Sequence, residues 1–374
     1  MMRRIEEVCR LLWVVLFAVA GIGALLALIY LITRFHKFGF MQKLAEKRKW
    51  LSWGLAALPV AGLVVVTLKN MYIGIIVILH LALIWSLCDL VTFIHRKRRH
   101  SWSSRYVTGV LAMLITAVYL GAGWFFAHHV FETDYRLKTK KHLDSSPLRV
   151  AMFADSHLGI TLDGKEFAEQ MKRIDEQSPD VVIIAGDFVD DDSKRDDMVR
   201  ACKALGEMKA KYGVIYVDGN HDKGYGNGRD FTIDELYAEL EKNGVKILHD
   251  EVFEVGDVNF IGRKDHHDDS RLSAKQLMEF ADDEKYTIII DHQPRDYEAE
   301  AAAGADLVLS GHTHGGHIFP SGFVGLAMGF NDNIYGKKVC GDTTFIVTSG
   351  ISGWAIPFKT GCISEYVIID VYDR

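Results

Sequence analysis

The chain has 374 residues and a formal net charge of −6, but the charge is divided unevenly along its length. Residues 1–141 carry 19 Lys and Arg against 6 Asp and Glu, whereas the remaining 233 residues carry 24 against 43. A basic, apolar third followed by an acidic, polar two-thirds excludes a uniform globular protein, a disordered chain and a small disulfide-stapled domain. The acidity of the second part also leads us to expect no nucleic-acid partner, because binding a polyphosphate backbone requires positive charge.

Four long apolar runs in the first third predict four transmembrane helices. They cover residues 11–33, 51–68, 71–94 and 106–127. Each run is long enough to cross a hydrocarbon core of about 30 Å, which needs roughly 20 apolar residues. The alternative is four buried helices of a soluble domain, but globular helices seldom stay this free of charge for so many turns. We therefore expect residues 1–130 to be a membrane region that contacts the lipid bilayer.

Asp89 is a charged residue within the third run. An ionisable side chain in a membrane is costly, so it either reaches the interface or pairs with a partner on a neighbouring helix. We expect Asp89 to do one of these and not to mark a transport pathway.

The basic residues of the connecting loops predict the orientation in the cell membrane. The first loop contains six Lys and Arg between residues 34 and 49, the third contains five between 96 and 105, and the second offers only Lys69. Because basic loops tend to stay in the cytoplasm, this pattern predicts a multi-pass protein whose C-terminal domain is extracytoplasmic. The basic residues before the first run and after the last run favour the opposite orientation.

The acidic part predicts an α/β domain. Residues 131–147 are polar and lack a clear period, so we interpret them as a linker, with a domain at 148–374. Within it, short runs rich in Val, Ile and Phe at 148–154, 180–185, 213–217, 286–290 and 306–309 have the length of buried strands. Helical spacing of apolar residues between the first three runs indicates strands that alternate with helices, and hence a parallel or mixed sheet.

Polar side chains follow each of these five predicted strands directly. In parallel sheets such groups gather at the carboxyl ends of the strands, where functional sites form. The groups are Asp155 and His157, then Asp187, then Asn220 with His221 and Asp222, then His292, and finally His312 and His314.

These residue types indicate a metal site. A single Asp-x-His would mean little, because a buried structural histidine explains most such pairs. Asp and His together, without Cys and with one Asn, suit divalent ions such as Mn, Fe or Zn. Seven of these nine side chains, all except His221 and Asp222, are taken as strong ligands. Seven exceed what one site with an open position uses, so we expect two ions.

The order of these motifs resembles the calcineurin-like metallophosphoesterase family. Asp-x-His, Gly-Asp-x-x-Asp, Gly-Asn-His-Asp, a lone His after a strand and Gly-His-Thr-His follow one another between about residues 148 and 370. The extended Gly-His-Thr-His-Gly-Gly further resembles the membrane-associated or exported branch that includes YkuE and YaeI. The resemblance implies mixed β-sheets flanked by helices in an α/β (α+β) domain.

The resemblance also implies roles for individual residues. One metal would be held by Asp155, His157, Asp187 and His314, and the other by Asp187, Asn220, His292 and His312, so that Asp187 bridges both ions. His221 would stabilise charge on the phosphate or protonate the leaving oxygen, and Asp222 could orient its imidazole. Asp190 either supports the site or belongs to a solvated loop, and residues 223–230 form either a mobile loop beside the site or a plain surface loop.

The sequence therefore predicts a membrane-anchored, metal-dependent hydrolase with two divalent ions. We expect it to act on phosphoester bonds, either phosphodiester or pyrophosphate, of a lipid-linked or cell-envelope substrate. The alternative is a membrane sensor or scaffold whose phosphoesterase-like domain binds a ligand without turnover. Degenerate enzymes lose a metal ligand, and none of the seven is missing here.

Overall fold

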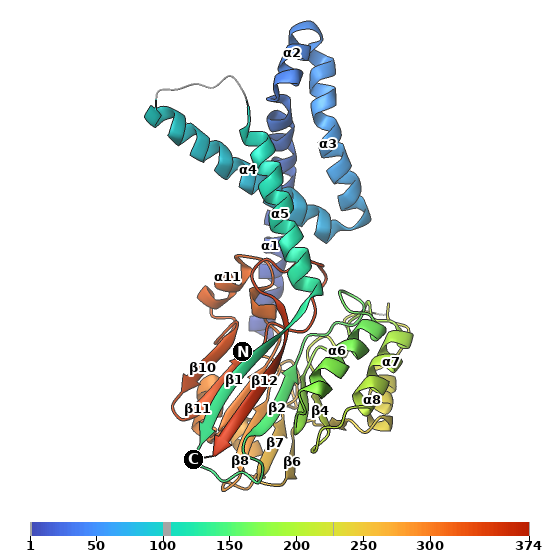
Figure 1. Cartoon of the computed structure of the whole chain (residues 1–374), viewed down its shortest axis with the longest axis vertical. Helices are drawn as coiled ribbons and strands as arrows, with labels where there is room; N and C mark the ends of the chain where they lie inside the picture. Colours follow the sequence, from blue (N-terminus) through green and yellow to red (C-terminus); the bar gives the residue numbers. More distant parts are fainter. Residues whose placement is uncertain (1, 100–105, 227, 374) are drawn as a thin grey trace. The chain divides into compact units, whose positions relative to one another are not determined.

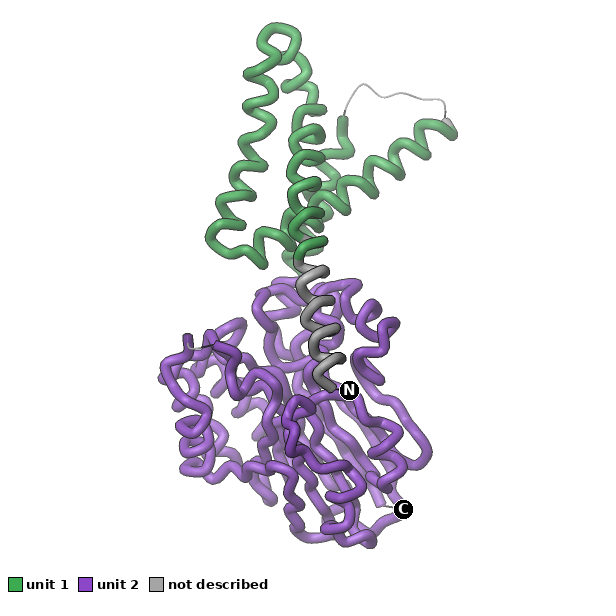
Figure 2. The backbone as a smooth tube through the Cα atoms, turned by 180° about the vertical axis from the view of Figure 1, so that it is seen from behind, with its two compact units in different colours: residues 1–122 green, residues 123–374 purple. Residues whose placement is uncertain are grey.

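The chain folds into two compact units. The computed structural model describes residues 2–99, 106–226 and 228–373. Unit 1 comprises Met1–Ala122 and unit 2 comprises Gly123–Arg374 (Figure 2). Unit 1 is helical, whereas unit 2 contains all the strands of the described residues (Figure 1).

Unit 1 is built from long apolar helices. They are α1 (Met2–His36), α2 (Gly39–Lys47), α3 (Lys49–Lys69), α4 (Met71–Arg99) and α5 (Thr108–His128), whose end belongs to unit 2. Among the described residues, three helices are long and apolar enough to cross a membrane: α3, α4 and α5. A fourth span results if Gly21–His36 and Gly39–Lys47, which meet at 81°, are counted as one. The side chains of residues 11–17, the start of the first predicted run, lie outside the described part.

The surface of these helices fits a lipid environment. Only 17% of the most apolar stretch of α3 and of α4, and 22% of that of α5, is buried by the protein. Large side chains such as Leu25, Leu58 and Leu83 are exposed, while Leu31 and Trp85 are buried between the helices. Four buried helices of a soluble domain would not leave so much apolar surface uncovered.

Asp89 is paired as expected from the sequence. Its Oδ2 lies 2.9 Å from Nη1 of Arg34 on α1, and its Oδ1 accepts a hydrogen bond of 3.0 Å from the Tyr106 hydroxyl. The charge is thus compensated inside the helical unit.

Unit 2 contains two six-stranded mixed sheets. The first has the strand order β1-β12-β2-β3-β4-β5 and the second β10-β11-β9-β8-β7-β6. The strands of the first sheet are β1 (Val130–Thr139), β12 (Ser364–Asp373), β2 (Leu148–Phe153), β3 (Val181–Ala185), β4 (Val214–Val217) and β5 (Lys246–Ile247). Those of the second are β10 (Gly336–Cys340), β11 (Thr343–Val347), β9 (Leu307–Ser310), β8 (Tyr286–Ile290), β7 (Val258–Gly262) and β6 (Glu251–Val255). Strands β2 to β5 run parallel, as do β7, β8, β9 and β11.

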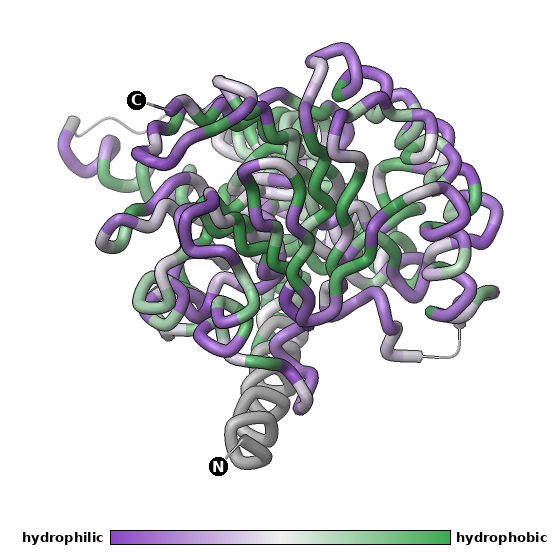
Figure 3. The backbone as a smooth tube through the Cα atoms, turned by 90° about the horizontal axis from the view of Figure 1, so that it is seen from below, coloured by the Kyte–Doolittle hydropathy of each residue, from purple (hydrophilic) through white to green (hydrophobic). Residues whose placement is uncertain are grey.

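The two sheets bury one face against each other. In β3, Val181, Ile183 and Ala185 belong to the cluster between the sheets, whereas Val182 and Ile184 belong to the cluster under the helices. This alternation of faces explains why buried strands read as unbroken apolar runs in the sequence. The apolar strands lie inside and the hydrophilic segments outside (Figure 3).

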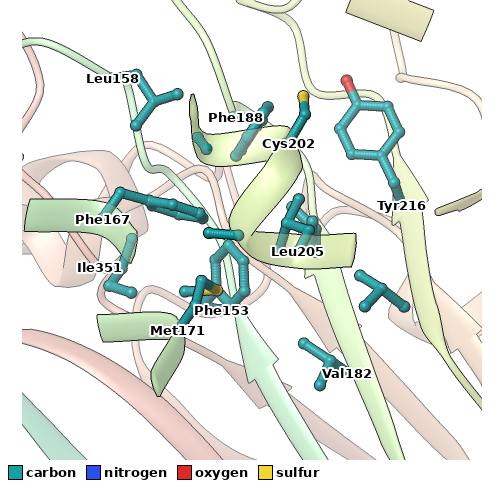
Figure 4. Packing of buried hydrophobic residues seen from close by; sticks show 14 of the residues in the cluster. Phe153, Leu158, Phe167, Met171, Val182, Phe188, Cys202, Leu205, Tyr216 and Ile351 are labelled. Atoms are coloured by element: carbon teal, nitrogen blue, oxygen red, sulfur yellow. The ribbon is translucent and has the colours of Figure 1, made fainter. Parts of the chain in front are cut away.

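Helices cover the outer faces of both sheets. The first sheet is covered by α6 (Gly164–Glu176), α7 (Arg195–Gly206) and α8 (Ile233–Lys242), and the second by α9 (Ala274–Met278) and α10 (Tyr297–Ala303). Phe153 of β2, Phe167 of α6 and Phe188 form edge-to-face ring contacts in this layer (Figure 4). A capping box at Asp163 and Glu166 fixes the start of α6. The 3₁₀ turn η1 (His314–Gly316) and α11 (Ser321–Ala327) follow β9.

The predicted linker at residues 131–147 is wrong over most of its length. Residues 130–139 form β1, which pairs in parallel with β12 from Val130 opposite Ser364 to Thr139 opposite Asp373. One face of β1 is exposed and carries charged residues, which hide the strand in a search for apolar runs. The sequence signal for this strand is the alternation of Phe131, Thr133, Tyr135 and Leu137 with charged residues, which a search for apolar runs does not detect. The five predicted strands of the domain are confirmed as β2, β3, β4, β8 and β9.

Candidate metal centre

The carboxyl ends of five strands bring the predicted site residues together. Strands β2, β3 and β4 lead into Asp155, Asp187 and Asn220, and strands β8 and β9 of the facing sheet lead into His292 and His312. Because parallel strands end at the same edge of a sheet, and the two sheets face each other, these side chains meet between the sheets.

Among the groups of side chains that are close enough to hold a cation, two combine the predicted ligands at these strand ends. Asp155, His157 and His314 have potential donor atoms that all lie within 4.8 Å of one another. The same is true of Asp187 with His292 and His312. Asp155, His157 and Asp187 are buried almost completely, so the groups are shielded from bulk water.

Asp187 joins the two groups. Its Oδ2 lies 3.1 Å from Nε2 of His292 in one group and 3.7 Å from Nε2 of His157 in the other. Its Oδ1 accepts the backbone N–H of His221 at 2.8 Å, which fixes the carboxylate in this orientation. The position between both groups is the one that the sequence resemblance implies for a bridging carboxylate.

Hydrogen bonds outside the groups orient the ligand atoms. Nδ1 of His292 lies 2.8 Å from the carbonyl oxygen of Ala185 and donates to it, so Nε2 faces the site with its lone pair. The Asp155 carboxylate accepts the backbone N–H of His312 at 3.0 Å. His292 and Asp155 are therefore each held by the backbone of a neighbouring strand end.

Asn220 offers a neutral oxygen. Its Nδ2 donates to the Tyr225 hydroxyl at 2.9 Å, which directs Oδ1 the other way. That Oδ1 is buried and has no hydrogen-bond partner among the described residues. A buried, unpaired acceptor is costly unless a cation binds it. Tyr225 also contacts the His221 ring, so this residue of the predicted loop lies beside the site.

The backbone is strained at the ligands. Five non-glycine residues of the two groups have φ in the left-handed region, from +35° to +71°: Asp155, His157, Asp187, His312 and His314. Such residues persist only where the surroundings enforce them, and they concentrate at functional sites. Glycines permit the close approach, because a Cβ at Gly219 would lie 2.1 Å from Oδ1 of Asp187 and one at Gly186 would lie 2.5 Å from Nδ1 of His292.

Burial and charge set the protonation of the site. Burial lowers the pKa of His312 to about 3 and that of His314 well below its usual value, so both imidazoles are neutral. Burial raises the pKa of Asp187, but the neighbouring His292 and His157 outweigh it and hold the carboxyl ionised. Metal ligands must be deprotonated, and His312, His314 and Asp187 meet this condition. Burial lowers the pKa of His292, but the charges of Asp187 and Asp155 outweigh this effect and raise it, so a cation would displace a proton there.

The donor set fits divalent cations. The Nε2 atoms of His157 and His314 lie only 3.2 Å apart in a buried space, facing the carboxylates of Asp155 and Asp187. Together with the unpaired Oδ1 of Asn220, these groups form a buried cluster dominated by acceptors, which a cation satisfies. Imidazole, carboxylate and amide donors without thiolate suit Mn, Fe or Zn and do not distinguish among them.

Asp190 supports two histidines at the edge of the cluster. Its Oδ2 lies 3.0 Å from Nδ1 of His157, and its Oδ1 lies 3.1 Å from Nδ1 of His221. Burial lowers the pKa of His221, but the hydrogen bond to Asp190 and the charge of Asp187 outweigh this effect and raise it. The sequence left Asp190 undecided between a supporting role and a solvated loop, and its contacts place it in the site.

The predicted role of Asp222 as the residue that orients His221 is wrong. Its buried carboxylate accepts the backbone N–H groups of Asp187, Phe188, Val189 and Gly219 at 2.7 to 3.0 Å. It thereby ties the loop after β3 to the loop after β4, while Asp190 holds the imidazole. Burial, together with the charge of Asp187, raises the pKa of Asp222 to about 7.

Trp354 forms an aromatic wall that the sequence analysis missed. Its ring centroid lies 5.4 Å from that of His221 and 6.4 Å from that of His314. It comes from the segment between β11 and β12, which bears no motif, so no local signal marked it.

Two facing mixed sheets with a buried Asp, His and Asn cluster at their carboxyl ends define the class of metal-dependent hydrolases. Residues 148–316 match the family model described as calcineurin-like phosphoesterase. The chain is 33% identical over 232 residues to an uncharacterised metallophosphoesterase of Campylobacter jejuni, covering 60% of this chain and 59% of that protein. It is 30% identical over 269 residues to one of Helicobacter pylori, covering 69% and 70%. The chain belongs to the calcineurin-like metallophosphoesterase family.

Two further relatives bear on the membrane region and the branch. A transmembrane protein with metallophosphoesterase domain of Danio rerio is 29% identical over 276 residues, which cover 68% of this chain and 61% of that protein. The metallophosphoesterase YkuE of Bacillus subtilis is 26% identical over 227 residues, which cover 55% of this chain and 74% of that protein. The resemblance stated from the motifs is thus confirmed. The chain spans less than two thirds of the length of the Campylobacter and Danio relatives.

Proposed function

We propose that this protein is a membrane-anchored phosphoesterase that uses two divalent ions to hydrolyse phosphodiester or pyrophosphate bonds. The observation that carries the proposal is the placement of Asp187 between two buried ligand groups, 3.1 Å from His292 and 3.7 Å from His157. A single carboxylate placed between two cation sites suits two-metal hydrolysis, in which the two ions lie about 3.5 to 4 Å apart.

The residues around the cluster have roles that follow from their contacts. Divalent ions bound there supply Lewis acidity, which lowers the pKa of water and offsets the charge of the phosphoryl oxygens. Asp190 holds Nδ1 of His221, so Nε2 is the nitrogen free to pass a proton to the leaving oxygen as its bond to phosphorus breaks. The rings of Tyr225 and Trp354 flank His221 and restrict water at that side.

The substrate class follows from the attachment to apolar helices. A hydrolase held beside a bilayer meets phosphoesters of lipids or of cell-envelope precursors at high local concentration. The basic first and third loops of unit 1 favour the cytoplasmic side for those loops, so the multi-pass region would place the metal centre outside the cytoplasm. Fusion of alkaline phosphatase to the C-terminus tests this orientation, because the reporter is active only outside the cytoplasm.

The activity is tested with the full-length protein in detergent or nanodiscs. We expect added Mn²⁺ to support hydrolysis of the chromogenic diester bis(p-nitrophenyl) phosphate, and a chelator to abolish it. A panel of soluble diesters, monoesters and lipid pyrophosphates then ranks the substrates. The absence of turnover with every divalent ion and every substrate would favour a sensor or scaffold that binds a ligand without hydrolysis.

A further inference from the structure

An apolar segment is exposed on the surface of unit 2. Residues 319–330 contain no charged side chain. They include α11, none of whose residues is buried. Phe319, Phe323, Val324, Leu326 and Met328, here called the α11 patch, are each between 41% and 62% exposed. An uncharged run of this length is typical of a core helix or of a segment at a membrane interface. The exposure of these side chains excludes a core helix.

The α11 patch is fixed to the loop that carries His312 and His314. The Ser321 hydroxyl donates to the carbonyl oxygen of Gly316 at 2.7 Å. Gly322 packs so closely on that loop that a Cβ there would lie 2.6 Å from the Cα of Gly316. Whatever binds the α11 patch therefore lies next to the metal centre.

The same patch is fixed to the end of α5. Within unit 2, the Lys359 backbone N–H donates to the carbonyl oxygen of Gly123 at 2.8 Å. The Phe319 N–H donates to the Thr360 hydroxyl at 3.1 Å, so the 359–360 turn contacts both segments. Trp124 and Phe125 are exposed at this end of α5. In Figure 1, α11 lies at the end of unit 2 where the chain leads from α5 into β1.

We propose that the α11 patch inserts into the surface of the lipid bilayer. An apolar helix long enough to cross a membrane ends at the bilayer surface, and exposed Trp and Phe residues mark that level. Two hydrogen bonds through the 359–360 turn hold the α11 patch beside this end of α5. The patch also lacks the negative charge that anionic headgroups would repel. Continuity with α5 favours the bilayer over a second copy of the chain as the occupant.

Insertion of the α11 patch into the bilayer narrows the substrate class. This inference about the substrate rests on the proposed function. Trp354 contacts His221 and His314 and lies in the segment that leads to the 359–360 turn. The metal centre therefore borders the face that meets the bilayer. A substrate whose phosphoester is at headgroup level can reach the centre while its acyl chains stay in the membrane.

Photo-crosslinking tests the docking independently of activity. Benzoylphenylalanine replaces Phe323, which is 62% exposed, or, as a matched control, Phe280, which is 67% exposed. Phe280 lies beside the amino ends of β7 and β8, because Asn259 of β7 donates to the carbonyl oxygen of Asp282 at 2.7 Å. His292, by contrast, follows the carboxyl end of β8, so Phe280 and His292 lie at opposite ends of the strands. The full chain is reconstituted in phosphatidylcholine vesicles that contain an alkyne-tagged phospholipid and is irradiated.

We expect a lipid adduct at position 323 that exceeds the adduct at position 280 by at least tenfold. Equal labelling at both positions, or no lipid adduct at position 323, would overturn the proposal. A chain-to-chain adduct in place of a lipid adduct at position 323 would assign the patch to a dimer interface and also overturn it.

A charge in the patch tests the link to substrate access. We expect Phe323→Glu, compared with Phe280→Glu, to lower turnover of a phospholipid substrate in vesicles about tenfold and to leave bis(p-nitrophenyl) phosphate hydrolysis unchanged. Equal turnover of both variants on the phospholipid would refute the access role. Failure of the wild type on every phosphoester would instead refute the proposed function, while the crosslinking result would stand.

Discussion

Replacing Asp190 by Asn tests a residue that supports the metal centre without being one of its proposed ligands. One carboxylate oxygen accepts a hydrogen bond from Nδ1 of His221 at 3.1 Å, and the other lies 3.0 Å from Nδ1 of His157. An amide of the same shape offers one acceptor and one donor. One histidine therefore keeps its partner, while the other faces an N–H group with its own N–H.

The expected loss follows from these two contacts. A hydrogen bond to a charged group contributes about 1.5 to 3 kcal/mol, and about 1.4 kcal/mol corresponds to a factor of ten. Loss of one such bond, with a repulsive contact in its place, predicts a fall of about 10- to 100-fold in metal affinity, turnover or both. Asp192→Asn is the matched control, because Asp192 is an exposed carboxylate in the same loop.

The assay measures Mn²⁺ affinity by calorimetry and turnover on bis(p-nitrophenyl) phosphate for Asp190→Asn, His221→Ala and the double variant. If Asp190 acts through His221, the double variant loses less turnover, as a free energy, than the two single variants lose together. An effect through His157 lowers metal affinity instead. Values for Asp190→Asn within threefold of Asp192→Asn in both measurements would refute the reasoning.

Asp187→Asn should leave the fold intact and reduce turnover by at least about 10³-fold, because an amide oxygen cannot serve two cations; two bound metals with near-normal turnover would exclude a bridging role. His221→Ala should keep its metal content but lose about 10²- to 10⁴-fold in rate, more for alkyl than for aryl leaving groups. Loss of a metal ion in that variant would make His221 a ligand. Arg263→Met should lower the free energy of unfolding by about 3 to 5 kcal/mol, because it strands the buried Glu300, 3.0 Å away, and leaves the buried Asp291 with Arg271 alone; thermal unfolding against an Arg200→Met control measures this, and equal melting temperatures would contradict it.

The strands and the convergence of the site residues could be predicted from the sequence because both depend on local patterns. A strand buried on both faces is an apolar run, and the residue after it lies at the sheet edge. Asp155, Asp187, Asn220, His292 and His312 all follow such runs. The rule fails for β1, whose exposed face carries charges although its backbone is fully paired with β12.

Contacts between distant segments could not be predicted in this way. Asp222 follows the Asn-His pair directly, which suggested a contact with His221, but its carboxylate points into the protein toward four backbone N–H groups. Asp190 lies 31 residues from His221 in the chain and meets it only after β3 and β4 pair. Trp354 reaches the site from a segment without any motif.

The metal content of the purified full-length protein tests the central claim most directly. Elemental analysis after equilibration with Mn²⁺ should find two metal ions per chain, and bis(p-nitrophenyl) phosphate hydrolysis should rise with occupancy and disappear on chelation. A ratio of one or zero at saturating Mn²⁺, Fe²⁺ and Zn²⁺, or hydrolysis that survives complete metal removal, would contradict a two-metal phosphoesterase.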